Sequence, residues 1–468
     1  MTTLSRRQLL MGMAALGATV AVAACAPVTP GAAPAQEGAG ATQEAIEIRW
    51  NVSDSTSVPV MMEIAEEALA IFQEQNPTIR VLPEPPPEEN EQVLTQMIAG
   101  TAPDVIGNCC DRLPFWASKK QLIALDDYVA RDMTAEQIAD YPVDHWNSFA
   151  NDRVGRYAMP LYMGVIVLYY NKDAFDAAGL AYPDESWNWT PDATGKYDEA
   201  MTALTDPAKK RWGIALSQGI DRLQCQIVGN GGNWRDPAND MVATFDQEPA
   251  LQAMQWLFDG IWTRNVVIPD AARESMGWYE LMANDRITMF QNGDWALVPM
   301  VETVGDKYNW DVAAVPQGPV TRNTLATTDG WVGWIGSKQP DAAWALMNFL
   351  QGDEWNNLMM SKGLIRPSRI SLFAKWVDAV KNNNPNLADK NLEAFGTAAE
   401  YATPQQYFRY NQQAIEIINA VMDATIKTGE TTDVRTAVIE AAVLVNEAQI
   451  AAEKEEASAG GCDCRRVM

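Results

Sequence analysis

The sequence predicts an α/β fold of two lobes whose segments alternate along the chain. First, an apolar run at residues 46–52 is followed by apolar residues three and four apart at 61–72 and by a second run at 79–82, which predicts a strand–helix–strand unit with a parallel sheet. Second, the chain has 468 residues, more than one hydrophobic core ordinarily organises. Third, a strand pattern appears at 331–335, after a helix-rich stretch, so we expect a late segment to return and complete the first sheet.

The remaining elements follow from the same two periodicities. Ligands bind past the carboxyl ends of parallel strands, so residues 53–57 and 108–111 are the expected site loops. Extended runs at 157–160 and 165–170 mark the expected change of lobe. The other patterns, in chain order, are a helix at 92–98, strands at 103–106, 287–290 and 311–315, and helices at 342–350, 415–422 and 434–445.

The first residues are typical of an export signal. Arg6 and Arg7 precede an apolar run that is too short to span a bilayer, which predicts a Tat-type lipoprotein signal peptide at 1–24. The run ends in small residues and Cys25, which resembles a bacterial lipobox; an ordinary signal peptide with a chance cysteine is the alternative. Residues 25–45 predict a flexible tether, because they are rich in Ala, Pro, Gly and Thr. We therefore expect an extracytoplasmic protein, periplasmic or on the cell surface, that lipidated Cys25 anchors to the cell membrane.

The composition argues against some partners and favours one ligand class. The formal net charge of −26 argues against nucleic acid and anionic lipid as partners, although solubility alone explains such acidity. With 17 Trp and one His, the chain suits sugar binding, which needs aromatic plates, better than acid–base catalysis. The six Cys show no metal-site or disulfide-framework spacing. Cys109 and Cys110 are expected to be small filling residues, and redox chemistry is the alternative for this pair. We expect no catalytic residue, cofactor or metal.

Several short motifs occur in the order that one known family has. They are residues 101–105, 121–128, 159–160, 169–175, 293–295, 315–319 and 363–367. Together they resemble the family-1 extracellular solute-binding proteins, of which maltose-binding protein is the best-known member, over about residues 46–445.

The resemblance implies a periplasmic-binding-protein type II fold, with two discontinuous lobes joined by a hinge. The expected first lobe is 46–157 with 313–338, the second is 158–312 with 339–450, and a tail follows at 451–468. A ligand that contacts both lobes would favour a closed form, which the permease subunits of an ABC transporter would then recognise. A monomer is expected.

The resemblance also implies ligand-binding residues. Asp54 and Ser55 match a sugar-contacting loop, and Asp111 with Arg112 matches a pair that binds sugar hydroxyls. In the second lobe, Gln218 falls in a ligand-contacting segment, Trp295 matches a stacking ring, and Tyr407 lies near a late aromatic contact. Asn108 stands where maltose-binding protein has an aromatic ring, and Gly164 stands where it has a ligand-binding Glu, so these two positions put its disaccharide ligand in question.

Most of these residues also have ordinary structural explanations. Trp116, Trp331 and Trp334 lie after a charged pair or at strand–turn junctions, where core packing explains each as well as a ligand contact does. An exposed ion pair is the alternative for Asp111 and Arg112, and a helix cap is the alternative for Asp54.

These observations predict the substrate-binding component of an ABC importer that captures a sugar or sugar-like solute and has no enzymatic activity. A secreted glycoside hydrolase, which needs two carboxylates across a cleft, is one alternative. A ligand-sensing lipoprotein is the other.

Overall fold

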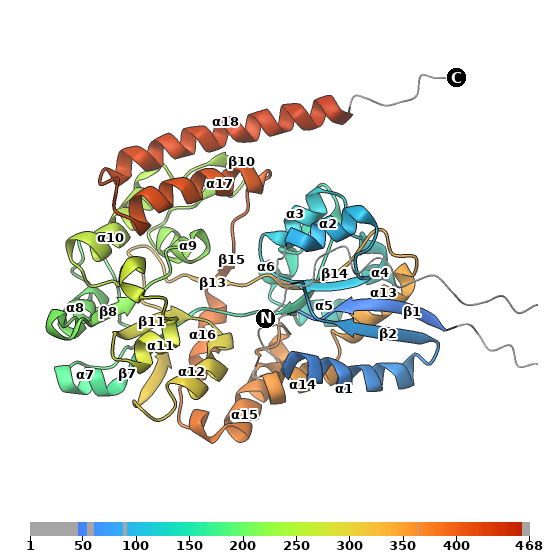
Figure 1. Ribbon diagram of the computed structural model, residues 1–468, viewed down its shortest axis with the longest axis horizontal. Coiled ribbons are helices and arrows are strands. Elements are labelled where there is room, and N and C mark those ends of the chain that lie inside the picture. Colours follow the sequence, from blue (N-terminus) through green and yellow to red (C-terminus); the bar gives the residue numbers. More distant parts are fainter. Residues whose placement is uncertain (1–44, 54–59, 88–90, 364, 461–468) are drawn as a thin grey trace, which may run out of the picture. The chain divides into compact units, whose positions relative to one another are not determined.

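Two separate sheets organise the chain (Figure 1). The computed structural model describes residues 45–53, 60–87, 91–363 and 365–460. The first sheet has the strand order β2-β1-β3-β14-β6, and the second has the order β12-β7-β11-β8. Within the described ranges no helix has both the length and the apolar character needed to cross a membrane.

The first sheet combines parallel strands from the start of the chain with a strand that returns late. β1 (Ile46–Asn51) pairs in parallel with β2 (Ile79–Glu84) and with β3 (Val105–Asn108). β14 (Asp329–Gly333) runs antiparallel between β3 and β6 (Met159–Tyr162). The strand–helix–strand unit and the late returning strand expected from the sequence are therefore both confirmed.

Helices cover both faces of this sheet. α1 (Val60–Gln75) and α13 (Pro340–Phe349) share one core with alternate strand residues such as Trp50. α2 (Glu91–Ala99) and α3 (Arg112–Ser118) share another core with strand residues that point the opposite way. Successive residues of a strand face opposite sides, so a sheet covered on both faces needs strands that are apolar throughout.

The second sheet is built around β7 (Val167–Asn171). β11 (Ile287–Asn292) and β12 (Trp310–Ala313) are both antiparallel to β7, and β8 (Trp212–Ala215) is parallel to β11. The chain leaves the carboxyl end of β8 through a short loop into α9 (Ile220–Gly229), and this connection later forms one wall of the candidate site.

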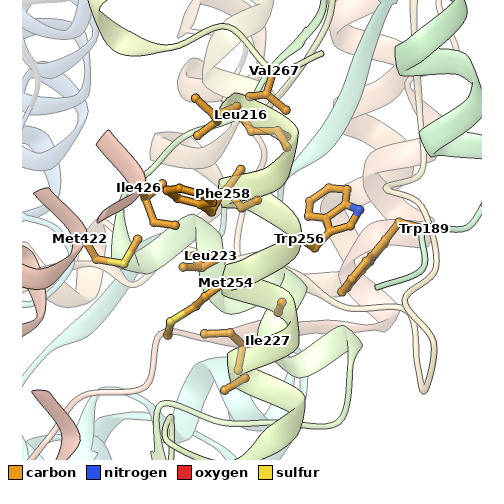
Figure 2. Close-up of a cluster of buried hydrophobic side chains, with 14 of the residues drawn as sticks. Trp189, Leu216, Leu223, Ile227, Met254, Trp256, Phe258, Val267, Met422 and Ile426 are labelled. Carbon is orange, nitrogen blue, oxygen red and sulfur yellow. The ribbon is translucent and has the colours of Figure 1, made fainter. Parts of the chain in front are cut away.

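The helix α10 (Glu248–Phe258) packs against α9 in the second lobe. Side chains on opposite sides of α10 are buried, so α10 is held firmly in place (Figure 2). Met254 and Phe258 are four residues apart and point together toward one side, while Trp256 points away toward Trp189. The Trp189 and Trp256 ring centroids are 4.8 Å apart. Burying large rings and thioethers on both sides gives α9 a rigid support.

The other elements complete the two lobes. The remaining helices are α4 (Asp126–Asp132), α5 (Ala135–Ala139), α6 (Val143–Asn147), α7 (Lys172–Ala178), α8 (Lys196–Leu204), α11 (Trp278–Ala283), α12 (Leu297–Thr303), α14 (Asp353–Leu358), α15 (Phe373–Asn383), α16 (Glu393–Glu400), α17 (Asn411–Met422) and α18 (Val434–Gly460). Three short strand pairs are β4 (Ala150–Asn151) with β5 (Gly155–Arg156), β9 (Arg235–Asp236) with β10 (Asn239–Ala243), and β13 (Thr324–Ala326) with β15 (Ala402–Pro404).

The chain passes between the lobes from β6 to β7, from β12 to β14, and again after α14. Three boundaries expected from the sequence differ from this packing. β6, expected in the second lobe, is part of the first sheet. Residues of α13 and α14, expected in the second lobe, pack in the core of the first sheet with Trp50. The helix α18 also continues to Gly460 instead of ending near residue 450, because its Ala- and Glu-rich end keeps a high helix propensity.

Candidate functional site

A cavity of about 680 Å³ lies where loops of the two lobes meet. The first lobe contributes the start of α1, the loop after β3 and the residues after α14. The second lobe contributes the first turn of α9, one residue of α11, and the turn and helix that follow β11. The segment from Leu325 to Asp329, which leads into β14, closes the wall between them. The cavity therefore lies past strand carboxyl ends, where the strand order predicted a site.

The polar wall from the second lobe is the pair Asp221 and Arg222 in the first turn of α9. Arg222 Nε lies 3.2 Å from a carboxylate oxygen of Asp221. The Arg222 guanidinium lies 5.3 Å from the centroid of the Trp295 ring, within the range of a cation–π contact. Arg222 Nη1 is buried and has no hydrogen-bond partner among the described residues, so it is a free donor at the cavity wall.

Trp295, for which the resemblance implies a stacking role, lines the cavity together with Tyr162 and Tyr279. It lies in the short helix η4 (Asp294–Ala296), directly after β11 and Gly293. A Cβ on Gly164 would lie 2.9 Å from Cε3 of the Trp295 ring, and closer still to Cζ3. Gly164 is therefore the residue that lets the ring lie flat against the backbone between β6 and β7, which explains why a larger side chain is not found there.

Asp294, next to Trp295, is fully buried. Burial raises its pKa to about 6, while the backbone N–H of Arg366, which donates to its carboxylate at 2.9 Å, and the Arg366 charge act in the opposite direction. Arg366 in turn donates through Nη1 to the carbonyl of Met163 at 2.8 Å. This buried pair joins the turn that presents Trp295 to the chain between β6 and β7.

The first-lobe wall contains Cys109 and Cys110, which form a disulfide between adjacent residues. The expectation that they are small filling residues is therefore wrong: bonded to each other, they are a covalent ring on the cavity surface. Asn108, at the buried end of β3, accepts a hydrogen bond from the Cys109 N–H at 2.8 Å and so orients this loop rather than lining the cavity.

Asp111 and Arg112 follow the disulfide at the start of α3, but neither lines the cavity. Arg112 Nη1 lies 3.8 Å from Cys109 Sγ. Burial raises the pKa of Asp111, the Arg112 charge lowers it, and the charge of Asp221 raises it further. The two carboxylates, one from each lobe, are thus close enough to influence each other.

Two further predicted residues, Tyr407 and Gln218, do not line this cavity themselves. The Tyr407 hydroxyl is 3.1 Å from Thr328 Oγ1 and donates to Gln405 Oε1 at 3.3 Å; both partners line the cavity, whereas Tyr407 lines a second one. Burial raises the pKa of Tyr407 well above its usual value. Gln218 is buried in the loop between β8 and α9, and neither polar atom of its amide has a hydrogen-bond partner among the described residues.

Three predicted tryptophans are part of the core, and none of them lines the cavity. Trp331 lies in β14 and packs edge-on against Trp50 and Trp355, with centroids 5.6 Å and 5.7 Å away. Trp116 and Trp334 are buried in the core on the opposite face of the sheet. All five residues of β14 are buried, and only its first residue, Asp329, reaches the cavity, so Trp331 packs between the helices that cover the sheet. The predicted residues Asp54, Ser55 and Cys25 lie outside the described residues.

Sequence reasoning missed the α9 pair, although a signal for it exists. The tripeptide Asp-Arg-Leu occurs twice, at residues 111–113 and 221–223, each time in the first turn of a helix that follows a strand. Only the second copy lines the cavity. Sequence reasoning also missed Asp329 and Glu302, which add carboxylates to the cavity wall.

Comparisons with known proteins agree with this architecture. A sugar-binding protein named multiple sugar-binding protein from Streptococcus mutans is 24% identical over 279 residues, which are 55% of this chain and 60% of that protein. An arabinooligosaccharide-binding protein from Halalkalibacterium halodurans is 22% identical over 255 residues, or 52% of this chain and 54% of its own. The chain thus matches little more than half the length of these curated relatives.

Solved structures match over more of the chain. An ABC substrate-binding protein from Listeria monocytogenes, in complex with cycloalternan, has a TM-score of 0.73 at 19% identity and covers 86% of this chain and 99% of its own. A solute-binding protein from Thermotoga lettingae, bound with α-D-tagatose, has a TM-score of 0.69 at 20% identity, covering 87% and 100%. These likenesses establish the two-lobed fold. The model of the bacterial extracellular solute-binding proteins matches residues 53–357, so the chain belongs to that family.

Proposed function

We propose that the chain is the substrate-binding component of an ABC importer and that the cavity between its lobes binds a sugar or sugar-like solute. The observation on which this rests is the composition of the cavity wall. Three aromatic rings line the cavity, those of Tyr162, Tyr279 and Trp295, and Trp295 lies beside a guanidinium and several carboxylates that come from different elements. Sugars present C–H groups on their faces and hydroxyls at their edges, so this combination matches both surfaces.

The placement of these groups also fits a closing mechanism. Asp221, Arg222 and Trp295 belong to the second lobe, while the disulfide and the start of α1 belong to the first. A ligand held by both walls gains contacts only when the lobes are close together, so binding shifts the population toward the closed form. The family relatives are named for sugar binding, and the fold neighbours were solved with bound sugars, which supports the ligand class.

The proposal includes the location of the protein and its partners. Lipidation of Cys25 after Tat export would hold the lobes near the membrane, where the permease subunits of the importer take up the released solute. A monomer suffices for this role, because both walls of the cavity come from one chain.

The test is a thermal-shift screen of the purified protein against D-glucose, D-tagatose, maltose, maltotriose and cycloalternan, followed by calorimetric titration of each sugar that raises the melting temperature. Trp295→Ala and Asp221→Asn should each weaken binding of that sugar about tenfold or more, because each removes a cavity contact. Trp262→Ala is the matched control, since Trp262 is 38% exposed and is not in the cavity wall. If both cavity variants bind as well as the unaltered protein, the site is wrong.

The same samples separate binding from hydrolysis. Carboxylates of Asp221, Glu302 and Asp329 line the cavity, so a glycoside hydrolase remains the alternative activity. Maltotriose incubated with the protein should remain intact while the melting temperature rises. Release of shorter sugars, lost in the Asp221→Asn variant, would replace the proposed function with a hydrolase.

A further inference from the structure

The cavity wall contributed by the first lobe carries an unusual covalent group. Cys109 and Cys110 are bonded to each other and both line the cavity. The carboxyl end of β3 carries no aromatic residue: the strand ends at Asn108, and Cys109 and Cys110 follow it. We propose that the oxidised Cys109–Cys110 pair is a ligand-contacting surface, a rigid plate that packs against the C–H face of a bound sugar ring. This inference rests on the proposed sugar-binding function.

The chemistry of the disulfide suits this role. A disulfide has no hydrogen to donate, and its sulfur atoms are polarisable and only weak acceptors, so it offers an apolar surface to C–H groups. Closing a ring between neighbouring residues also removes the side-chain rotations that two free thiols would keep. The plate is therefore already ordered before a ligand arrives, which lowers the entropy cost of binding.

The surrounding contacts hold the plate in place. Cys110 has a left-handed backbone with φ of +66°, and its N–H donates to the carbonyl of Thr328 at 3.2 Å. The side chain of Asn108 accepts from the Cys109 N–H at 2.8 Å. Backbone and side-chain hydrogen bonds thus fix the loop on both sides of the disulfide, and the bond is not needed merely to hold the loop together.

The position of the plate complements the opposite wall. Trp295 and Arg222 line the cavity from the second lobe, and the disulfide lines it from the first, as do Val60, Met61 and Tyr162. A sugar ring between the Trp295 ring and the disulfide would have an aromatic face on one side and a sulfur face on the other. Polar groups of Asp221, Thr328 and Gln405 remain for its hydroxyl edge.

The first experiment compares the oxidised and reduced protein. Dithiothreitol gives two electrons and two protons to the pair: the S–S bond breaks, two thiols form, and the reagent becomes its own cyclic disulfide. The five sugars of the screen above are titrated into both forms. We expect each sugar that the oxidised protein binds to bind about tenfold more weakly after reduction, a loss of about 1.4 kcal/mol.

The second experiment removes the plate but keeps the loop. In Cys109→Ala with Cys110→Gly, glycine adopts the left-handed backbone readily, so the loop conformation survives without a disulfide. This variant should bind sugar about tenfold more weakly, whether dithiothreitol is present or not, and an unchanged melting temperature without sugar should show that the fold is intact. Insensitivity to dithiothreitol also shows that the remaining cysteines do not cause the effect.

The outcomes are distinct. If the unaltered oxidised protein binds sugar and the double variant binds it equally well, the disulfide is not a ligand-contacting surface and the proposed sugar-binding function stands. If none of the five sugars binds the unaltered protein, both the proposed function and this inference are wrong. Alkylation of the unreduced, denatured protein by iodoacetamide is an independent check: modification of Cys109 and Cys110 in the unreduced sample would show that the disulfide does not form, and would overturn the inference.

Discussion

Replacing Gly164 by alanine tests whether the Trp295 ring lies where the cavity requires it. The added Cβ would stand 2.9 Å from Trp295 Cε3 and 3.1 Å from a carboxylate oxygen of Asp294. The backbone of Gly164 cannot retreat easily, because its N–H donates to Thr327 Oγ1 at 3.0 Å and its carbonyl accepts from the Thr327 N–H at 2.9 Å. The ring must therefore move instead.

The size of the effect follows from these distances. Carbon atoms pack best at about 3.5–4.0 Å, so Cε3 must retreat by about 0.6–1.1 Å and the closer Cζ3 by more than that, and overpacking of this kind costs about 1–3 kcal/mol. The open side of the ring is the cavity, so it moves toward the ligand. We expect Gly164→Ala to lose about 1–3 kcal/mol of unfolding free energy and to weaken sugar binding as well.

Urea unfolding followed by circular dichroism measures the first effect, and calorimetric titration measures the second. Gly229→Ala is the matched control: its nearest neighbours would be 3.5 Å from the new Cβ, which is ordinary contact, and it ends α9. That variant should keep its stability or gain up to about 1 kcal/mol from helix propensity. If Gly164→Ala unfolds like the control and binds sugar unchanged, the ring does not lie against Gly164.

Two further predictions concern a buried acid and the lipid anchor. Burial raises the pKa of Asp294 from 3.8 to about 6, so the folded chain binds more protons than the unfolded chain between these values, and the contribution of Asp294 to stability falls by about 3 kcal/mol as the pH rises through them. Asp294→Asn should lack this component, so urea unfolding should show the variant gaining stability relative to the unaltered protein at pH 7 compared with pH 4. An equal difference between the two proteins at both pH values would contradict the prediction. Cys25→Ala should move the protein from the membrane fraction to the soluble fraction of cells that produce the full chain, and a variant that still sediments with membranes would rule out a lipid anchor at this residue.

Much of the fold was predictable, because it follows from periodicity along the chain. The helix at 61–72 is visible as apolar residues three and four apart, and the strands at 46–52 and 79–82 are visible as short apolar runs. The structure has α1, β1 and β2 there. The returning strand was also predictable, but its role was not fully so. A strand buried on both faces shows no alternation, so the sequence could not tell that Trp331 faces a core.

The site was harder to predict, because it depends on residues far apart in the sequence. Trp295 was identified through the motif at residues 293–295 that resembles the family's, whereas Arg222 lies in an ordinary helix and becomes notable only through its contact with that ring. The disulfide was missed for a different reason. Spacing rules look for cysteines that close loops, and the adjacent Cys109 and Cys110 close no loop of other residues.

The position of β14 determines when the protein is able to fold. This strand fills the gap between β3 and β6, so a growing chain that has not yet reached residue 333 has two unpaired edges inside its first sheet. The first sheet can therefore be completed only after the ribosome has made the second sheet as well. An incomplete first sheet exposes strand edges that can pair with other chains and aggregate. An export route that accepts only folded proteins, such as the one expected from Arg6 and Arg7, would keep the chain in the cytoplasm until this sheet is complete.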